Sequence, residues 1–274
     1  MAGTANAATV PAVTAFPVVG NVTYTDDFGA PRPQGPHEGN DLMSIRHQPA
    51  VAFEGGTVEK HSKPGSCMLY LHGLSGMTYV YIHLNNDLGP TNDNLGGCKN
   101  GVSYAPGLVN GQRVRRGQLV GYVGDSGDAN GLQPHLHFEV RTPTGRAIDP
   151  YPYLRRSVRL LYPRPAAGTD LSLVFKKAVL VAQGDGTITI RTRREVLLPN
   201  AWSYLYERNV TITVPTEALV LRRTTTGPTA ASLGATDVGK PLRVWTTPFT
   251  PSWMTQKAPA GLLFVDHILL GSPG

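Results

Sequence analysis

Residues 134–140 have the sequence PHLHFEV, and this stretch decides how the chain is expected to fold. Apolar and polar residues alternate along it, which is typical of a β-strand with one face in a core. Residues two apart on a strand share a face, so His135 and His137 should project together, with Phe138 packed on the other side. An H-x-H pair on a strand suits a metal site in which one or both imidazoles bind the ion.

The same period-two alternation recurs on both sides of PHLHFEV. In the stretch 78–83 it predicts that Tyr79, Tyr81 and His83 share one face of a strand. A hairpin is expected where a QGDG turn separates two alternating runs. No segment carries a sustained apolar stripe with the 3.6-residue period of a helix. The sequence therefore predicts an all-β fold with strands near residues 67–71, 78–83, 118–123, 135–140, 177–182, 187–193, 209–214, 219–223, 242–247 and 262–270.

Changes in composition along the chain predict four segments. A Pro-punctuated N-terminal stretch is expected to be an extended arm, and a run rich in Pro, Ala and Gly marks a linker between two β-domains. The expected bounds are 1–20 for the arm, 21–157 for an antiparallel-sheet domain, 158–168 for the linker and 169–274 for a small β-barrel or sandwich. A Gly/Asn-rich stretch near 85–110 interrupts the first domain, and long loops of this kind are often functional.

The composition limits the classes of protein to which the chain can belong. With 41% hydrophobic and 16% charged residues, its 274 residues can build a packed core. No apolar run approaches the roughly 20 residues of a membrane span. The net charge of +6 is spread along the chain. A basic surface suits nucleic acid, acidic glycopolymers or a cell envelope, and of these we expect an anionic polymer of the envelope and no nucleic-acid partner. The first ten residues lack the pattern of a secretory signal, so a leader was trimmed or the protein leaves its cell by another route.

A second motif, HEGND, places His37 four residues before Asp41. Two histidines and one carboxylate form a common catalytic zinc set, which leaves the fourth position for water. Zinc lowers the pKa of that water towards about 7 and so provides a nucleophile at neutral pH.

Together, HEGND and PHLHFEV resemble the H-x-G-x-D and H-L-H-F-E signatures of the lysostaphin/LytM-like zinc endopeptidases of bacterial cell walls. Other segments agree in the same order between about residues 22 and 155. They are DDFGAPR (26–32), GGTV (55–58), YIHL (81–84), NGQRVRRGQLVGYVGDSGDANG (110–131) and IDPYPYL (148–154).

The resemblance implies one Zn²⁺ per chain in a groove of the first domain. His37, Asp41 and His137 would be the zinc ligands, and His83 and His135 the catalytic histidines that handle protons and stabilise the tetrahedral intermediate. The implied function is an endopeptidase, such as an endolysin, that hydrolyses stem or cross-bridge peptides of peptidoglycan. It would act outside the cytoplasm at the cell wall, either as a secreted protein or as part of a phage virion.

A competing interpretation is a structural subunit of a phage tail tip that retains the peptidase fold, active or not. Its arm and C-terminal domain would then bind other subunits of a virion or envelope assembly. Contacts between the arm and other chains would distinguish this class from a free enzyme.

Two other motifs and the two cysteines allow alternative interpretations. An HExxH zinc site would need a second histidine at position 41 on a helix, where Asp41 stands and Gly39 disfavours a helix. GDSG (124–127) resembles the nucleophile turn of chymotrypsin-like proteases, but no other motif supplies a base histidine. Cys67 and Cys98 form either a disulfide or two buried thiols. Surface or structural roles are expected for the remaining histidines, His47, His61, His72 and His267.

Overall fold

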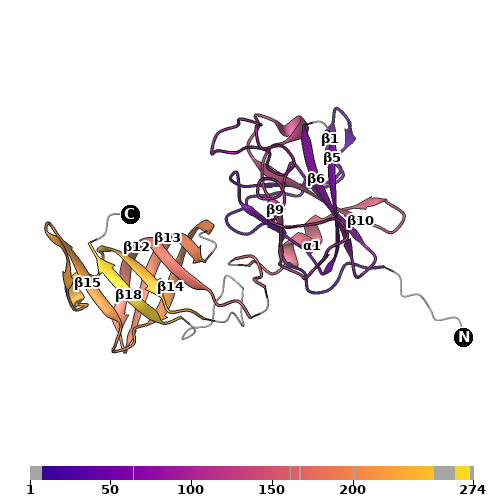
Figure 1. The fold of residues 1–274 in the computed structure, drawn as a ribbon. Coiled ribbons are helices and arrows are strands. Elements are labelled where there is room, and N and C mark those ends of the chain that lie inside the picture. The colour runs from indigo at the N-terminus through magenta and orange to yellow at the C-terminus, as the bar shows by residue number, and fades with distance from the viewer. Residues whose placement is uncertain are drawn as a thin grey trace, which may run out of the picture. The chain divides into compact units, whose positions relative to one another are not determined.

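A computed structural model describes residues 8–63, 65–160, 162–166, 168–199, 202–249 and 263–271. The chain divides into two compact units, Met1–Pro165 (unit 1) and Ala166–Gly274 (unit 2) (Figure 1). Strands dominate both units in the described ranges, where α1 (Tyr151–Arg156) is the single α-helix. The expected all-β class is confirmed. None of the helices in these ranges is long and apolar enough to cross a membrane.

The main sheet of unit 1 has seven antiparallel strands in the order β11-β10-β7-β6-β5-β8, with β3 also paired to β10. Their bounds are β3 (Asn40–Met43), β5 (Gly56–Lys63), β6 (Ser66–Gly73), β7 (Thr78–Ile82), β8 (Arg113–Val114), β10 (His135–Arg141) and β11 (Ala147–Ile148). Two small sheets pair β1 (Pro31–Arg32) with β2 (Gly35–Pro36) and β4 (Pro49–Val51) with β9 (Leu119–Tyr122). A 3₁₀ turn, η1 (Gly127–Ala129), precedes β10.

An aromatic cluster forms the core under this sheet. Tyr81 of β7 lies opposite Phe138 of β10, and their ring centroids are 5.3 Å apart. Phe53 packs against the Tyr79 and Phe138 rings at 4.9 and 5.1 Å. The Tyr81 hydroxyl donates to the Val51 carbonyl (3.0 Å), so its polar end is satisfied although the ring is fully buried. This apolar face fixes β10 firmly, with its histidines on the opposite side.

The described part of the expected arm is built into unit 1. Phe16, Val18 and Val19 are fully or almost fully buried. The backbone N–H of Ala15 donates to Phe53 (2.8 Å), and that of Phe16 donates to Val158 (2.9 Å). Contacts of the arm with other subunits stay a prediction.

The Gly/Asn-rich stretch between β7 and β8 has no strand, yet it is held at several points. Asp87 and Asp125 are fully buried and both pair with Arg46, whose guanidinium bonds the two oxygens of Asp125 at 2.9 and 3.0 Å. Cys67 and Cys98 form a disulfide with their Cα atoms 5.2 Å apart. Of the two states considered for the cysteines, the structure has the bridge.

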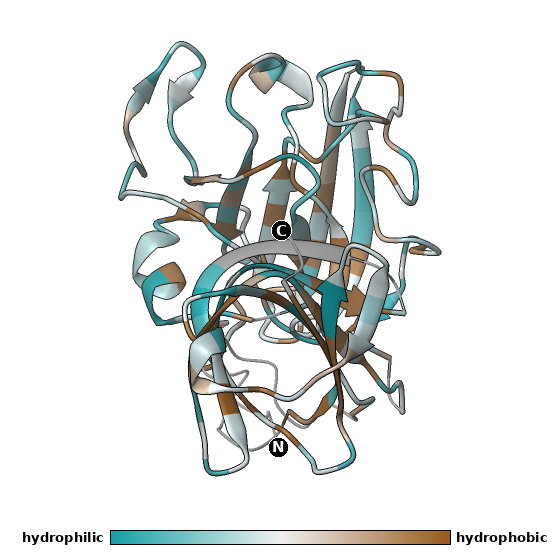
Figure 2. Ribbon diagram, turned by 90° about the vertical axis from the view of Figure 1, so that its left-hand side faces the viewer, coloured by the Kyte–Doolittle hydropathy of each residue, from teal (hydrophilic) through white to brown (hydrophobic). Residues whose placement is uncertain are grey.

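Unit 2 is one seven-stranded sheet in the order β14-β13-β12-β17-β18-β15-β16, antiparallel except for the β15–β18 pair. The bounds are β12 (Ser172–Gly184), β13 (Thr187–Leu198), β14 (Trp202–Thr213), β15 (Leu219–Thr224), β16 (Gly227–Ala230), β17 (Pro241–Thr246) and β18 (Val265–Leu270), with a 3₁₀ turn η2 (Ala235–Asp237). Figure 2 shows hydrophobic and hydrophilic segments alternating along single strands.

Two features of unit 2 bear on the sequence predictions. The β12–β13 hairpin turns at Asp185 and Gly186, which both have positive φ (49° and 68°). A two-residue type I′ turn between twisted strands requires positive φ at both positions, and Asp-Gly favours this turn. Of the barrel or sandwich expected, a closed barrel is not formed among the described strands, because β14 and β16 are the two ends of an open sheet. Pro228 in β16 lacks a backbone N–H, which suits an edge position. Residue 262, expected at the start of the last strand, lies outside the described ranges.

Candidate metal centre

Strand pairing brings HEGND and PHLHFEV together. In the β3–β10 register, Asp41 lies directly opposite His137, so the two side chains are cross-strand neighbours on one face. Gly39 makes this approach feasible. A Cβ at that position would lie 2.5 Å from the Phe138 carbonyl oxygen and 2.8 Å from Nε2 of His137, closer than atoms can approach.

Three potential ligand atoms converge at this point. Nε2 of His37 lies 2.9 Å from Nδ1 of His137 and 3.2 Å from Oδ1 of Asp41, and the last two atoms are 3.0 Å apart. All three residues are less than a tenth exposed. Within the described ranges, they are the one group of His, Cys, Asp or Glu side chains close enough together to hold a metal ion.

This donor set fits a zinc ion. Ligands about 2.0–2.1 Å from a tetrahedral ion lie roughly 3.3 Å from one another, close to the separations observed here. Two imidazole nitrogens and one carboxylate oxygen also match the three-ligand catalytic sites that keep a fourth position open. The structure therefore brings together the three residues expected as ligands.

The charge balance also favours a cation. Burial raises the pKa of Asp41, but hydrogen bonds with His137 and His37 outweigh it and hold that pKa well below its ordinary value. Burial lowers the pKa of His137, yet the bonds to Asp41 and Glu139 prevail and raise it to about 9. The carboxylates thus stabilise positive charge at His137, whether carried by a proton or by a metal ion.

Asp27, which the sequence analysis did not single out, supports two of these ligands. Its backbone carbonyl accepts from Nδ1 of His37 (2.9 Å), which leaves Nε2 of that ring free to bind an ion. Its Oδ1 accepts from the side chain of Asn40 (2.8 Å), and its Oδ2 pairs with Arg32 (3.3 Å). Arg32 also donates to Oδ2 of Asp41 (2.8 Å), so Oδ1 is the oxygen that faces the cluster.

Glu139 supports the third ligand. Its Oε1 lies 3.2 Å from Nε2 of His137, and its Oε2 accepts from Nε of Arg141 (2.5 Å). Arg141 also pairs with Glu38 (2.6 Å), the residue next to His37. A carboxylate on the outer nitrogen of a metal-binding imidazole fixes its orientation and increases its basicity. Glu139 could have been identified from the sequence, because it lies two residues after His137 on the same face of β10.

His83 and His135 complete the cluster without joining the ligand set. The His83 ring centroid lies 4.8 Å from that of His135 and 6.0 Å from that of His137. Nδ1 of His83 bonds the Ser126 carbonyl (2.8 Å), and Nδ1 of His135 bonds the Gln133 carbonyl (2.9 Å). A carbonyl can only accept, so both Nδ1 atoms carry protons, and in the neutral form of each ring Nε2 is the nitrogen with the lone pair.

The prediction that His83 shares a face with Tyr79 and Tyr81 is wrong. Tyr81 packs on Phe138, whereas His83 packs on His135 and His137, on the other side of β10. The reason is the backbone. β7 ends at Ile82, and His83 has a positive φ of 60°, which breaks the strand alternation. Burial lowers the pKa of His83 to about 4, so the ring is neutral at neutral pH.

The other four histidines lie outside this cluster. His47 bonds the Gly89 carbonyl (3.0 Å), and His61 and His72 each lie 2.9 Å from a carboxylate oxygen of the exposed Glu59. His267, in unit 2, stacks on Trp245 with centroids 4.0 Å apart.

Residues 102–150 match Peptidase family M23. This segment contains His135 and His137, while His37, Asp41 and His83 precede it. The resemblance to lysostaphin/LytM-like peptidases that the sequence motifs carry is confirmed.

Two relatives are similar to parts of the chain. The L-Ala–D-Glu endopeptidase of Bacillus subtilis is 28% identical over 160 residues, covering 54% of this chain and 44% of the relative. An uncharacterized metalloprotease of Haemophilus influenzae is 30% identical over 119 residues, covering 42% of this chain and 20% of the relative. The chain thus spans less than half the length of these relatives.

Solved structures are similar over about half of the chain. A protein from Ruminococcus gnavus described as a putative glycyl-glycine endopeptidase LytM is 25% identical with a TM-score of 0.41, covering 52% of this chain and 59% of its own. The catalytic domain of lysostaphin from Staphylococcus simulans is 23% identical with a TM-score of 0.38, covering 49% of this chain and 93% of its own.

Proposed function

We propose that the chain is a zinc-dependent endopeptidase that hydrolyses peptide bonds of peptidoglycan, in its stem or cross-bridge peptides. The observation that carries this proposal is the convergence of His37, Asp41 and His137, with the imidazoles of His83 and His135 packed beside them. The match to Peptidase family M23 and the similarity to an L-Ala–D-Glu endopeptidase support the reaction class and the substrate.

In this proposal His37, Asp41 and His137 hold one Zn²⁺ through Nε2, Oδ1 and Nδ1. When bound, the ion supplies Lewis acidity, which lowers the pKa of a coordinated water and polarises the carbonyl of the scissile bond. Asp27, Arg32 and Glu139 orient the ligands through their hydrogen bonds to His37, Asp41 and His137.

His83 and His135 handle protons at their Nε2 atoms. Both rings are held through Nδ1 by backbone carbonyls, so the lone pair on Nε2 is available to take a proton from the attacking water. The protonated imidazole then donates to the leaving amine. A neutral ring in the resting state is required for the first of these steps, and the low pKa of His83 agrees with it.

The proposed place of action is the cell wall outside the cytoplasm. The disulfide between Cys67 and Cys98 fits an oxidising environment. Secretion and carriage on a phage virion both agree with this feature.

The experiment is digestion of purified peptidoglycan from several wall types, with mass spectrometry of the released fragments. We expect new peptide amino termini with the zinc-loaded protein, loss of cleavage after chelation, and recovery when zinc is added back. Release of sugar termini instead of peptide termini, or cleavage that persists after complete chelation, would contradict the proposal.

A further inference from the structure

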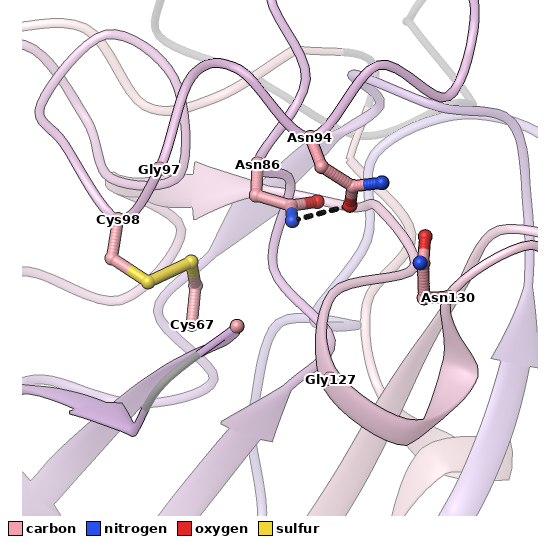
Figure 3. Close-up of a pocket in the computed structure, with 8 residues that line it drawn as sticks. Cys67, Asn86, Asn94, Gly97, Cys98, Gly127 and Asn130 are labelled. Carbon is pink, nitrogen blue, oxygen red and sulfur yellow. Dashed lines mark hydrogen bonds between the residues drawn. A yellow bond between two sulfur atoms is a disulfide. The ribbon is translucent and has the colours of Figure 1, made fainter.

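A cavity of about 490 Å³ opens in unit 1 on the Gly/Asn-rich stretch between β7 and β8 (Figure 3). Asn86, Asn94 and Asn130 line it, together with glycines such as Gly97 and Gly127. None of the lining residues is charged. The cavity therefore presents carboxamide side chains together with main-chain groups of glycine residues.

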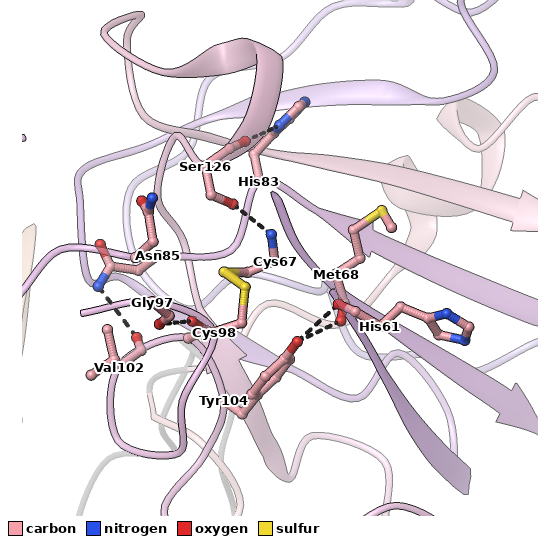
Figure 4. The surroundings of a disulfide bond; sticks show 12 residues. His61, Cys67, Met68, His83, Asn85, Gly97, Cys98, Val102, Tyr104 and Ser126 are labelled. Carbon is pink, nitrogen blue, oxygen red and sulfur yellow. Dashed lines mark hydrogen bonds between the residues drawn. A yellow bond between two sulfur atoms is a disulfide. The ribbon is translucent and has the colours of Figure 1, made fainter. Parts of the chain in front are cut away.

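The wall of this cavity also supports His83 (Figure 4). Gly127 follows Ser126, whose carbonyl accepts from Nδ1 of His83 at 2.8 Å. Cys67, another lining residue, donates its N–H to Oγ of Ser126 (3.0 Å) and accepts from the N–H of Leu84 (3.0 Å). A group bound in the cavity thus contacts the same backbone that orients a proposed catalytic histidine.

The cavity is pre-organised by bonds within the loop. The disulfide ties Cys98 to β6, and the buried Oδ1 of Asp87 accepts from the N–H groups of Asp93 and Asn94, both at 2.7 Å. The N–H of Gly96 donates to the Asn86 carbonyl (2.8 Å). Pre-organisation of this kind lowers the entropic cost of binding a ligand.

The hydrogen-bond network fixes which groups the cavity presents. Oδ1 of Asn94 accepts from Nδ2 of Asn86, and Oδ1 of Asn130 accepts from Nδ2 of Asn92, both at 2.8 Å. The oxygens of Asn94 and Asn130 are therefore occupied, whereas Oδ1 of Asn86 is buried without a hydrogen-bond partner among the described residues and offers an acceptor. The Nδ2 groups of Asn94 and Asn130 have no protein acceptor among the described residues, so each offers N–H donors.

We propose that this cavity is a substrate subsite that binds amide carbonyl groups beside the backbone that holds His83. Uncharged N–H donors match neutral carbonyl oxygens, whereas a carboxylate would call for a cationic partner that the lining lacks. Main-chain amides of a peptide and acetamido groups of an amino sugar share this chemistry. The inference rests on the proposed function, because peptidoglycan contains both groups.

Two glycine variants test the subsite. Gly97 lines the cavity at a φ of 59°. A Cβ there would have one neighbouring atom within 4 Å, Cε of Lys99 at 4.0 Å. Asn tolerates this left-handed conformation, so Gly97→Asn adds a side chain to the wall at little strain. Gly107→Asn is the matched control, because Gly107 has a φ of 72°, open space around it and no place in the lining.

A third variant removes a donor. Asn94 has a φ of 55°, which glycine adopts freely, so Asn94→Gly deletes the carboxamide while keeping the backbone conformation. For the zinc-loaded full chain, we expect Gly97→Asn and Asn94→Gly to raise KM for soluble stem peptides about tenfold, the value of one or two hydrogen bonds. Gly107→Asn should leave KM unchanged, and kcat should stay within about twofold throughout.

Binding is measured independently by NMR in a His135→Ala background, so that the peptide is not consumed. The side-chain NH₂ signals of Asn94 and Asn130 are followed during titration with a soluble stem peptide and, separately, with the tetramer of N-acetylglucosamine. We expect both signals to shift with the peptide. A shift with the sugar alone would support an amide-carbonyl site but assign it to the glycan.

Equal effects of Gly97→Asn and Gly107→Asn on KM would overturn the subsite, as would NH₂ signals that shift with neither probe. Both results leave the proposed function intact if the peptide is still cleaved. If no peptide is cleaved by the parent chain and yet the NH₂ signals shift, the proposed function fails and the cavity assignment stands.

Discussion

The buried Asp41 of unit 1 has different partners from the buried carboxylates described in unit 2. In unit 2, Glu195 bonds Arg208 through both oxygens (2.6 and 2.9 Å), and Asp237 bonds Arg222 in the same way (2.9 and 3.1 Å). In unit 1, Asp41 bonds two imidazoles as well as Arg32. A guanidinium stays protonated, so it neutralises the carboxylate and fills its hydrogen-bond positions. An imidazole, in contrast, can exchange its proton for a metal ion. The arginine-paired carboxylates therefore stabilise unit 2, as Asp87 and Asp125 with Arg46 do in unit 1, whereas Asp41 prepares unit 1 to bind a cation.

The strongest test of this contrast is His37→Ala. Removing one of the three ligands should abolish zinc binding at micromolar metal and reduce peptide cleavage to the level of the metal-free protein. Zinc content after dialysis and cleavage of a soluble stem peptide are the measurements. His72→Ala is the control, because His72 is exposed on β6 and lies outside the cluster. Retention of stoichiometric zinc by His37→Ala would mean that the ligand set is wrong.

A smaller effect is expected for the two histidines that are not ligands. His83→Ala and His135→Ala should each keep the metal and lose about 10²–10⁴-fold in kcat, the usual value of general acid–base catalysis. Zinc content and kcat are measured on the same preparations. Metal loss equal to that of His37→Ala would show that the assignment of ligands and proton carriers is wrong.

The sequence predicted some of the site residues behind these two predictions correctly and missed the placement or role of others. The common face of His135 and His137 followed from strand period alone, and His37 and Asp41 followed from the resemblance that HEGND carries. The orientation of His83 did not, because a positive φ after β7 moves its ring to the other face of the sheet. Asp27 acts through its carbonyl and through contacts with distant residues, which no local pattern encodes.

The fold shows the same limit. Alternation identified the long strands and the Asp-Gly turn of unit 2, since both depend on neighbouring residues. The short β16 was missed because Gly227 and Pro228 have low strand propensity, and its pairing with β15 determines the structure. The disulfide remained undecided because it depends on how the loop before Cys98 returns to β6.

Carboxylates of similar burial in the two units give a matched pair of variants. Glu139→Gln should lower zinc affinity about 10–100-fold, because Glu139 orients the His137 ligand. Glu195→Gln should leave zinc affinity unchanged, although it weakens a buried ion pair in unit 2. Affinity is measured by competition with a chromophoric chelator, and thermal unfolding shows whether each variant is folded. Equal losses of affinity would remove the distinction between the two carboxylates.

Proton release gives a subtler test of the same distinction. The pKa of His137 is raised to about 9 by Asp41 and Glu139, so a proton stabilises the metal-free fold fully below about pH 6.5, the ordinary pKa. That stabilisation is lost as the pH rises through 9. Zinc binding at pH 7.5 should therefore release about one proton from this ring, and less above pH 9. Calorimetry in two buffers with different ionisation enthalpies measures the number.

The smallest effect is expected from removing unit 2 altogether. Unit 1 contains the five clustered residues, whereas the described buried carboxylates of unit 2 are paired with arginines. A chain that ends at Pro165 should therefore keep zinc affinity and cleavage of a soluble peptide within about twofold. Several arginines of unit 2, such as Arg191 and Arg223, are exposed and suit an anionic wall polymer.

Binding to whole walls separates the two roles. If unit 2 positions the enzyme by charge, the shortened chain should bind walls more weakly. Wall binding by the full chain should also decline with added salt, because at 0.1 M salt interactions between exposed charges more than about 10 Å apart are largely screened. Sedimentation with purified walls at several salt concentrations provides the measurement. Loss of soluble-peptide cleavage by a folded, zinc-loaded unit 1 would show instead that unit 2 completes the active site, and the contrast between a chemical and a positioning unit would then be wrong.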